Sequence, residues 1–415
     1  MKVKSKGINE NRIIFLIFLF AFFEFIRPQT LVPALSSLRI PLLLAIILFA
    51  IWLLNGNKEV LKHPLIKRNL WFLFFIIIGL LFAVNHFSVV EKFKLNATYL
   101  VAFCLPFISW VNSYSRLNKF FILWLSIHFI IALMSVGSAG KGVGSFLQDE
   151  NDLALVLTMA IPYAFFMANI PGIGFKYKLI LYACLGVFVL AVILSFSRGG
   201  FIGLACVIFM LWLSSKEKVK KLLIGLFLFL LMIPFIPEKY YSEVQSITDT
   251  EESTAYDRLY MWRRGLEMFV DNPILGVGAG NYNWNVSIYE ERSKEFDNRT
   301  MNHGGRVSHS LYFTIIPEFG LAGIIIFYGI FTIIYKRGGR IWKAYKKNPD
   351  SDDDFIALAH LAKAAQVSLI GYLTAGAFIS VLYYPHLWYL IAIFISIEMA
   401  VLKNHSHLLE SKKNM

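Results

Sequence analysis

Long runs of apolar residues dominate this chain and limit the folds open to it. A helix needs about 20 mostly apolar residues, with a range of roughly 17–25, to cross a bilayer. Backbone groups in hydrocarbon must pair within their own segment, and the runs show no alternation typical of a barrel. The sequence therefore predicts an all-α integral membrane protein with about twelve transmembrane helices. The expected spans are 11–27, 38–54, 70–86, 94–111, 119–137, 152–170, 177–196, 199–214, 220–236, 308–335, 359–381 and 384–402.

The charge of the chain fits the same class. Only 16% of its 415 residues are charged, whereas a soluble domain carries about 25%. The formal net charge of +13 would suggest nucleic acid in a soluble protein. Here the lysines and arginines gather in alternate loops, as the positive-inside rule expects. We therefore expect a membrane-lipid environment and no nucleic-acid partner.

The same loops orient the expected bundle. One side collects basic clusters: Lys2, Lys4, Lys6 and Arg12; Lys58, Lys62, Lys67 and Arg68; Arg116 and Lys119; Lys176 and Lys178; Lys216, Lys218, Lys220 and Lys221; Lys336 to Lys347; and Lys403. The other side carries more acids than bases. We expect both termini in the cytoplasm. The first apolar run has no small-residue cleavage site after it, so it is interpreted as a retained span rather than a signal peptide.

One long segment, 237–308, is not apolar, and it predicts a large loop on the periplasmic face. The expected divisions are helices one to nine over 1–236, the loop with short helices over 237–308, and helices ten to twelve with a cytoplasmic tail over 309–415. Within the loop, 254–270 predicts a helix that places Leu259, Trp262, Leu266 and Phe269 on one face. Asn272-Pro273 predicts its end.

Arg198 interrupts an apolar stretch, in the sequence Ser-Phe-Ser-Arg-Gly-Gly. Ionisable residues inside a membrane are candidates for function, and we expect this arginine to be buried beneath the loop. Its glycines, Gly199 and Gly200, would allow a turn and a close approach of a ligand to the backbone. The alternative is a short turn between two spans with Arg198 reaching the headgroups.

The loop helix and the next span add further candidates. Arg258 is four residues before Trp262, so the indole could orient the guanidinium. Glu267 lies three to four residues after Arg263 and Arg264 and could pair with either, which favours a structural role for both arginines. Arg264 and Trp262 are secondary candidates for the site. His309 opens the span after the loop, with Ser308 as a plausible N-cap. A helix N-terminus would disfavour imidazolium and leave the ring free to accept a proton.

Other chemistries have weaker patterns. Glu318 lies on the opposite helical face from His309, so a dyad would require a kink at Pro317. The three cysteines lie in apolar runs without metal-ligand spacing, and the histidines lack the spacing of a zinc site. We expect no metal and no cofactor.

Taken in order, these motifs resemble the O-antigen ligase and O-antigen polymerase superfamily. They are Ser-Phe-Ser-Arg-Gly-Gly at 195–200, Arg-x-x-x-Trp at 258–262, Asn-Pro-x-x-Gly-x-Gly at 272–278, Ser-His-Ser-Leu at 308–311 and Glu-Phe-Gly at 318–320. The stretch 151–155 is most similar to the O-glycosylation-ligase-like branch. Ser310 stands where the family usually has Asn after the histidine.

The resemblance implies a GT-C-like membrane glycosyltransferase of the bacterial inner membrane. Such an enzyme would move a glycan from undecaprenyl pyrophosphate to a hydroxyl of lipid A-core, another glycan or a protein, without a metal and with inversion. The resemblance places pyrophosphate binding at Arg198 and Arg258 and the general base at His309. The alternatives are a transporter or flippase of lipid-linked oligosaccharides, which would spread its charges near the midplane, and a membrane scaffold whose loop binds a partner.

Overall fold

The computed structural model describes residues 9–138, 149–215, 218–219, 253–292 and 304–409. Within these ranges the regular structure is helical. The helices of the N-terminal third are α1 (Glu10–Phe25), α2 (Pro28–Leu31), α3 (Pro33–Ser36), α4 (Ile40–Asn55), α5 (Pro64–Ile78), α6 (His86–Thr98), α7 (Leu105–Trp110) and α8 (Tyr114–Gly137). The others are α9 (Glu150–Ala168), α10 (Phe175–Leu194), α11 (Arg198–Ser214), α14 (Ser253–Asp271), α15 (Tyr282–Glu291), α16 (Tyr312–Lys347), α17 (Asp353–Ala375) and α18 (Pro385–Leu409).

Every expected span except 220–236 overlaps a helix, and 220–236 lies outside the described residues. The bounds differ most at 70–86, where the helix α5 is Pro64–Ile78, and at 308–335, where α16 is Tyr312–Lys347. Among the described helices, eight are long and apolar enough to cross a membrane. The helices α1, α4 and α11 are apolar but shorter, with 16, 16 and 17 residues. The span expected at 94–111 belongs to a longer helical segment, His86–Trp110, in which a π-helical stretch, Tyr99–Cys104, joins α6 to α7. The membrane class is thus confirmed, while the number twelve stays a prediction.

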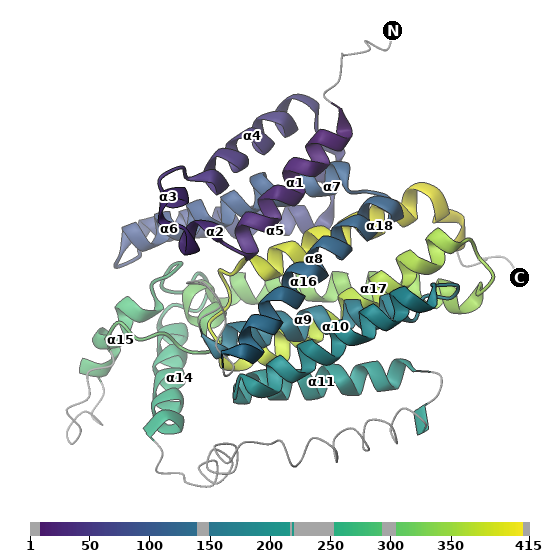
Figure 1. Cartoon of the computed structure of the whole chain (residues 1–415). Coiled ribbons are helices and arrows are strands. Elements are labelled where there is room, and N and C mark those ends of the chain that lie inside the picture. The colour runs from purple at the N-terminus through teal and green to yellow at the C-terminus, as the bar shows by residue number, and fades with distance from the viewer. Residues whose placement is uncertain (1–8, 139–148, 216–217, 220–252, 293–303, 410–415) are drawn as a thin grey trace, which may run out of the picture.

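The core of the bundle is formed by α9, α17 and α18. In an apolar stretch of 18 residues in each of these helices, 89%, 83% and 89% of the residues are buried, so the helices are surrounded by protein. In the corresponding stretch of α10 only 22% are buried, so this helix presents most of its surface outward. In Figure 1, α9, α10, α11 and α17 run in broadly the same direction, as expected for a spanning bundle.

Charged residues inside the bundle have partners. Glu398 of α18 pairs with Arg337 of α16 at 2.9 Å and with His63 at 3.1 Å, and Glu24 pairs with Arg27 at 3.5 Å. A buried charge that is paired and hydrogen-bonded avoids most of its desolvation cost. These pairs give both glutamates a structural role.

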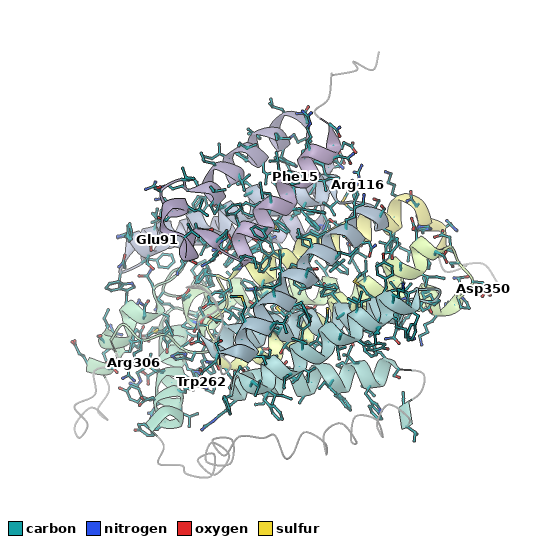
Figure 2. The ribbon with its side chains drawn as sticks, viewed as in Figure 1. Phe15, Glu91, Arg116, Trp262, Arg306 and Asp350 are labelled. Carbon is teal, nitrogen blue, oxygen red and sulfur yellow. The ribbon has the colours of Figure 1, made fainter. Side chains whose placement is uncertain are left out.

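The helices α14 and α15 lie together at one end of the bundle, and α14 runs across the direction of the spanning helices (Figure 1). The expected helix at 254–270 is confirmed, as is its end before Asn272. Figure 2 shows Trp262 and Arg306 at this end, and Asp350, in the turn between α16 and α17, far from it. Asp352 caps α17 by accepting a hydrogen bond of 2.8 Å from the Phe355 amide.

The loop after α14 is attached to the bundle at a break in the helix α16. Pro317 cannot donate a backbone hydrogen bond, and Gly320 has a left-handed φ of 56°. The carbonyls of Pro317 and Glu318 accept instead from the amides of Val277 and Gly278, at 2.8 and 3.1 Å. In return, the amides at positions 321 and 322 donate to the carbonyls at positions 273 and 274. The loop after α14 therefore replaces the missing hydrogen bonds of α16.

The glycines of both motifs make this joint possible. A Cβ on Gly276 would lie 2.4 Å from backbone atoms of Glu318 and Phe319, and one on Gly320 would lie 2.6 Å from the Pro273 carbonyl. Gly276, Gly278 and Gly280 all have positive φ, where other residues are strained. Asn-Pro-x-x-Gly-x-Gly and Glu-Phe-Gly are thus two halves of one structural joint.

Candidate functional site

Arg198 is the first residue of α11 and its side chain is exposed. Ser197 caps the helix by accepting a hydrogen bond of 2.9 Å from the Gly200 amide, and its hydroxyl donates to Oδ1 of Asn151 at 2.7 Å. The expected burial of Arg198 is wrong, because the chain turns between α10 and α11 at this point and brings the guanidinium to the end of the bundle.

The two glycines after Arg198 serve packing rather than a turn. Both lie within α11, and neither has a positive φ. A Cβ on Gly199 would come within 2.8 Å of Phe378, and one on Gly200 within 2.3 Å of the Ala154 Cβ. The expectation that they let a ligand approach the backbone is replaced by close contact of α11 with α9 and with the end of α17.

Arg258 of α14 is half-buried and lies near Arg198. Burial lowers the pKa of Arg258, and the positive charge of Arg198 lowers it further. Two guanidinium groups from distant parts of the sequence therefore share one region. Like charges repel, so such a pair is a favourable place for an anion.

Trp262 links α14 to the segment that carries His309. Its indole Nε1 donates to the Ser308 carbonyl at 2.9 Å, and its ring stacks on Phe313 with centroids 4.8 Å apart. The expectation that the indole orients Arg258 has no contact to support it within the described residues. The structure gives Trp262 a different task, which is to hold the backbone before His309.

His309 lies three residues before α16, which begins at Tyr312. Ser308 is therefore not the N-cap of that helix; its hydroxyl contacts Thr314 and Ser380 instead. His309 has a left-handed φ of 49°, a conformation that few non-glycine residues adopt, and such outliers gather at functional sites. The Leu311 amide, which donates to the Gly376 carbonyl at 2.7 Å, fixes the chain on the other side.

The pKa of His309 is lowered, and the causes differ from the expected helix dipole. The side chain keeps an open face to solvent, but the atoms packed around the ring desolvate its charged form, which is the largest cause. The charge of Arg258 lowers the pKa further, Asp149 opposes it, and Arg306 adds to the lowering. A neutral imidazole results, so the ring is in the form that accepts a proton.

Asp149 and Arg306 are site residues that the sequence motifs miss. Asp149 caps α9 by accepting a hydrogen bond of 2.8 Å from the Asn151 amide, and its charge reaches His309. Arg306 pairs with Asp257, the neighbour of Arg258, at 2.9 Å. Both charges are visible in the sequence, Asp149 just before the span at 152–170 and Arg306 three positions before His309. Neither residue belongs to a recognisable motif.

Arg264 and Glu318 belong to the framework in this structure. Arg264 is 1% exposed, pairs with Glu267 at 3.1 Å and lies over the Tyr260 ring, while Arg263 lies 3.7 Å from the same carboxylate. Glu318 is buried and accepts hydrogen bonds from the amides at positions 280 and 282 and from the Tyr383 hydroxyl. No contact joins Glu318 to His309 in the part of the chain that is described.

The apolar face expected on α14 is wrong in detail. Met261 and Met268 are buried against α15 and its surroundings, whereas Leu259 and Leu266 are exposed. Arg264 and Gly265 lie on the buried face, where Arg264 pairs with Glu267 and donates to the Tyr289 carbonyl at 3.3 Å. Hydrophobic spacing alone could not anticipate a buried arginine.

The described residues contain no group of three or more His, Cys, Asp or Glu side chains that could hold a metal ion. Within these ranges, the polar groups that converge with His309 are cationic, apart from Asp149 and Asp257. Such an arrangement suits an anionic substrate group better than a cation.

The apolar helices among the described residues define a multi-pass membrane protein. Residues 183–328 match the family model described as O-Antigen ligase. This confirms the O-antigen ligase and polymerase superfamily for the part of the chain that contains Arg198, Arg258 and His309. A comparison with curated proteins found no match.

Proposed function

We propose that the chain is a glycosyltransferase that moves a glycan from undecaprenyl pyrophosphate to an acceptor hydroxyl. The observation that carries the proposal is the neighbourhood of Arg198, Arg258 and His309. The charge of Arg198 lowers the pKa of Arg258, and the charge of Arg258 lowers the pKa of His309. All three lie within the residues that match the O-antigen ligase family.

The arginines suit a diphosphate that must leave with its negative charge. Planar guanidinium groups match phosphate oxygens in geometry, and fixed cations stabilise charge as it develops. In the proposed reaction the bond between the sugar carbon and the diphosphate oxygen breaks, and the electron pair leaves with undecaprenyl pyrophosphate. Arg198 and Arg258 hold that leaving group without help from a metal.

His309 suits the role of general base. Its lowered pKa keeps the ring neutral, and a neutral imidazole removes the proton from the acceptor hydroxyl as the oxygen attacks the sugar carbon. Direct displacement inverts the configuration at that carbon. The partners are thus a lipid-linked glycan donor and a lipid A-core, glycan or protein acceptor, and the site opens to the periplasm with both termini in the cytoplasm.

The test is transfer in reconstituted vesicles. Purified chain, undecaprenyl-pyrophosphate glycan and candidate acceptors are combined with and without EDTA. Arg198→Ala, Arg258→Ala and His309→Ala should each abolish transfer, and EDTA should have no effect. Arg292→Ala is the control, because Arg292 is an exposed arginine at the end of α15 whose pair with Asp271 lies at the surface.

Two results would contradict the proposal. One is wild-type transfer by all three alanine variants, which would remove the assigned roles. The other is movement of intact donor across the vesicle membrane without any transfer, which would favour a flippase.

A further inference from the structure

The helix α14 leaves an apolar face exposed. Leu259, Leu266 and Val270 are 63%, 47% and 73% exposed. They are seven and four residues apart, so they lie on one face of the helix. The opposite face, with Met261 and Met268, is buried. Ile274, 67% exposed, continues the apolar surface just beyond the helix.

Comparable exposure occurs on the apolar helices of the bundle. Leu54 of α4 and Leu179 of α10 are 81% and 60% exposed, on apolar helices whose outer surface meets lipid in a membrane protein. A contiguous apolar surface open to water indicates a binding or membrane surface. The α14 face thus resembles the lipid-facing surface of the bundle more than a water-facing loop.

The orientation and the charges of α14 favour lipid as the occupant. The helix crosses the direction of α9, α10 and α11 at their end (Figure 1), so it runs along the membrane surface if those helices span. Arg263 lies beside the apolar face, 59% exposed and 3.7 Å from the Glu267 carboxylate, at a position where a basic residue meets headgroup phosphates. The acids Asp257, Glu267 and Asp271 are spaced to lie together on another flank.

We propose that the face formed by Leu259, Leu266 and Val270 lies in the interface of the bilayer, in contact with lipid acyl chains. An amphipathic helix with an apolar face and a basic residue binds membranes in this way. Arg258, one residue before Leu259, would then be held at the height of the headgroup phosphates, where a lipid diphosphate lies. This consequence rests on the proposed function, whereas the membrane contact itself does not.

The test is the position of the face relative to lipid. In a full-length background with Cys104, Cys184 and Cys206 changed to alanine, Leu266→Cys and Val270→Cys are labelled with an environment-sensitive fluorophore. The variants are reconstituted in vesicles of phosphatidylethanolamine and phosphatidylglycerol. Brominated acyl chains should lower the fluorescence about twofold or more at both sites, as expected for a face buried among acyl chains, and iodide in the water should have little effect.

Arg292→Cys is the matched control. Arg292 lies at the end of α15, its side chain is 63% exposed, and its pair with Asp271 is at the surface, where such pairs contribute little. It should show the reverse quenching pattern. Equal access of iodide to all three sites would overturn the proposal, and so would protection of 266 and 270 from both quenchers, which would indicate a protein cover. Because no transfer is measured, failure of the proposed function would leave the result intact.

Discussion

The indole of Trp262 donates a hydrogen bond of 2.9 Å to the carbonyl of Ser308, the residue immediately before His309. Trp262 is one turn of α14 after Arg258, so a single helix supplies both a phosphate-binding candidate and the support for the candidate base. The stacking of the same indole on Phe313, at an interplanar angle of 2°, holds the other side of the His309 turn. The relative position of Arg258 and His309 therefore depends on Trp262.

Trp262→Phe tests this support. Phenylalanine retains an aromatic ring to stack on Phe313 but cannot donate to the Ser308 carbonyl. A lost hydrogen bond costs about 0.5–1.5 kcal/mol net, so we expect kcat to fall roughly threefold to tenfold, with little change in the KM for donor. Trp284→Phe on α15, where the indole is half exposed, is the control and should keep wild-type kcat. Equal kcat in the two variants would argue against a positioning role.

The charges around His309 predict opposite pH effects for two variants. Asp149 raises the pKa of His309, and Arg306 lowers it. If neutral His309 is the base, transfer is lost as pH falls through that pKa. Asp149→Asn should move the acidic limb of the kcat/KM profile to lower pH, because a charge that favours imidazolium is gone. Arg306→Gln should move it to higher pH.

The pair of substitutions contains its own control. Asparagine also caps helices well, so Asp149→Asn leaves the start of α9 intact while it removes the charge. Shifts in the same direction for both variants, or no shift in either, would mean that the acidic limb does not report His309.

Much of the bundle could be predicted because the length of a local apolar run determines where a membrane helix forms. The apolar length of each run gives α9, α10 and α17, and Pro273 and Asp352 mark the end of one helix and the start of another. The site is only partly visible in the sequence. Arg198, Arg258 and His309 stand out as motifs, but their neighbourhood follows from the packing of α11, α14 and the His309 turn, which lie far apart along the chain.

The remaining differences share a physical cause, which is that tertiary contacts override local pattern. Positions 199 and 200 require glycine because α11 packs closely against Phe378 and Ala154. The turn between α10 and α11 lies before them and does not require glycine at either position. His309 departs from helical φ because Trp262 fixes the preceding carbonyl. Arg264 is buried because Glu267 neutralises it. The contacts of α11 with Phe378 and Ala154 and the bond from Trp262 cannot be read from spacing along the sequence, whereas the Arg264–Glu267 pair follows from helical spacing.

We expect replacement of Glu318 to lower the stability of the fold rather than to remove a catalytic group. Its carboxylate accepts hydrogen bonds from the Gly280 amide at 2.9 Å, the Tyr282 amide at 3.2 Å and the Tyr383 hydroxyl. Glu318→Ala removes the acceptor of the Tyr282 amide and of the Tyr383 hydroxyl, at about 1–3 kcal/mol each, while the Gly280 amide keeps the Tyr383 hydroxyl as an acceptor at 3.0 Å. We expect a lower thermal midpoint in detergent and faster proteolysis near α14 and α15. Glu91→Ala, at an exposed position of α6, should stay within about 0.5 kcal/mol of wild type. Loss of transfer with an unchanged midpoint would instead give Glu318 a chemical role.

The joint between α16 and the loop after α14 predicts that Gly320 cannot be replaced. Its φ of 56° and ψ of −147° lie close to a region that is nearly exclusive to glycine, so a residue with a Cβ there costs about 1–3 kcal/mol. That Cβ would also lie 2.6 Å from the Pro273 carbonyl, so the loop must move. Gly320→Ala should lower the thermal midpoint and weaken the attachment of α14, with reduced transfer as a consequence. Gly186→Ala in α10 is the matched control, since a Cβ there meets no atom within 4 Å and alanine favours a helix by about 0.5–1 kcal/mol over glycine. If both variants unfold at the same temperature and transfer equally well, the hydrogen bonds across the break in α16 do not hold the site in place.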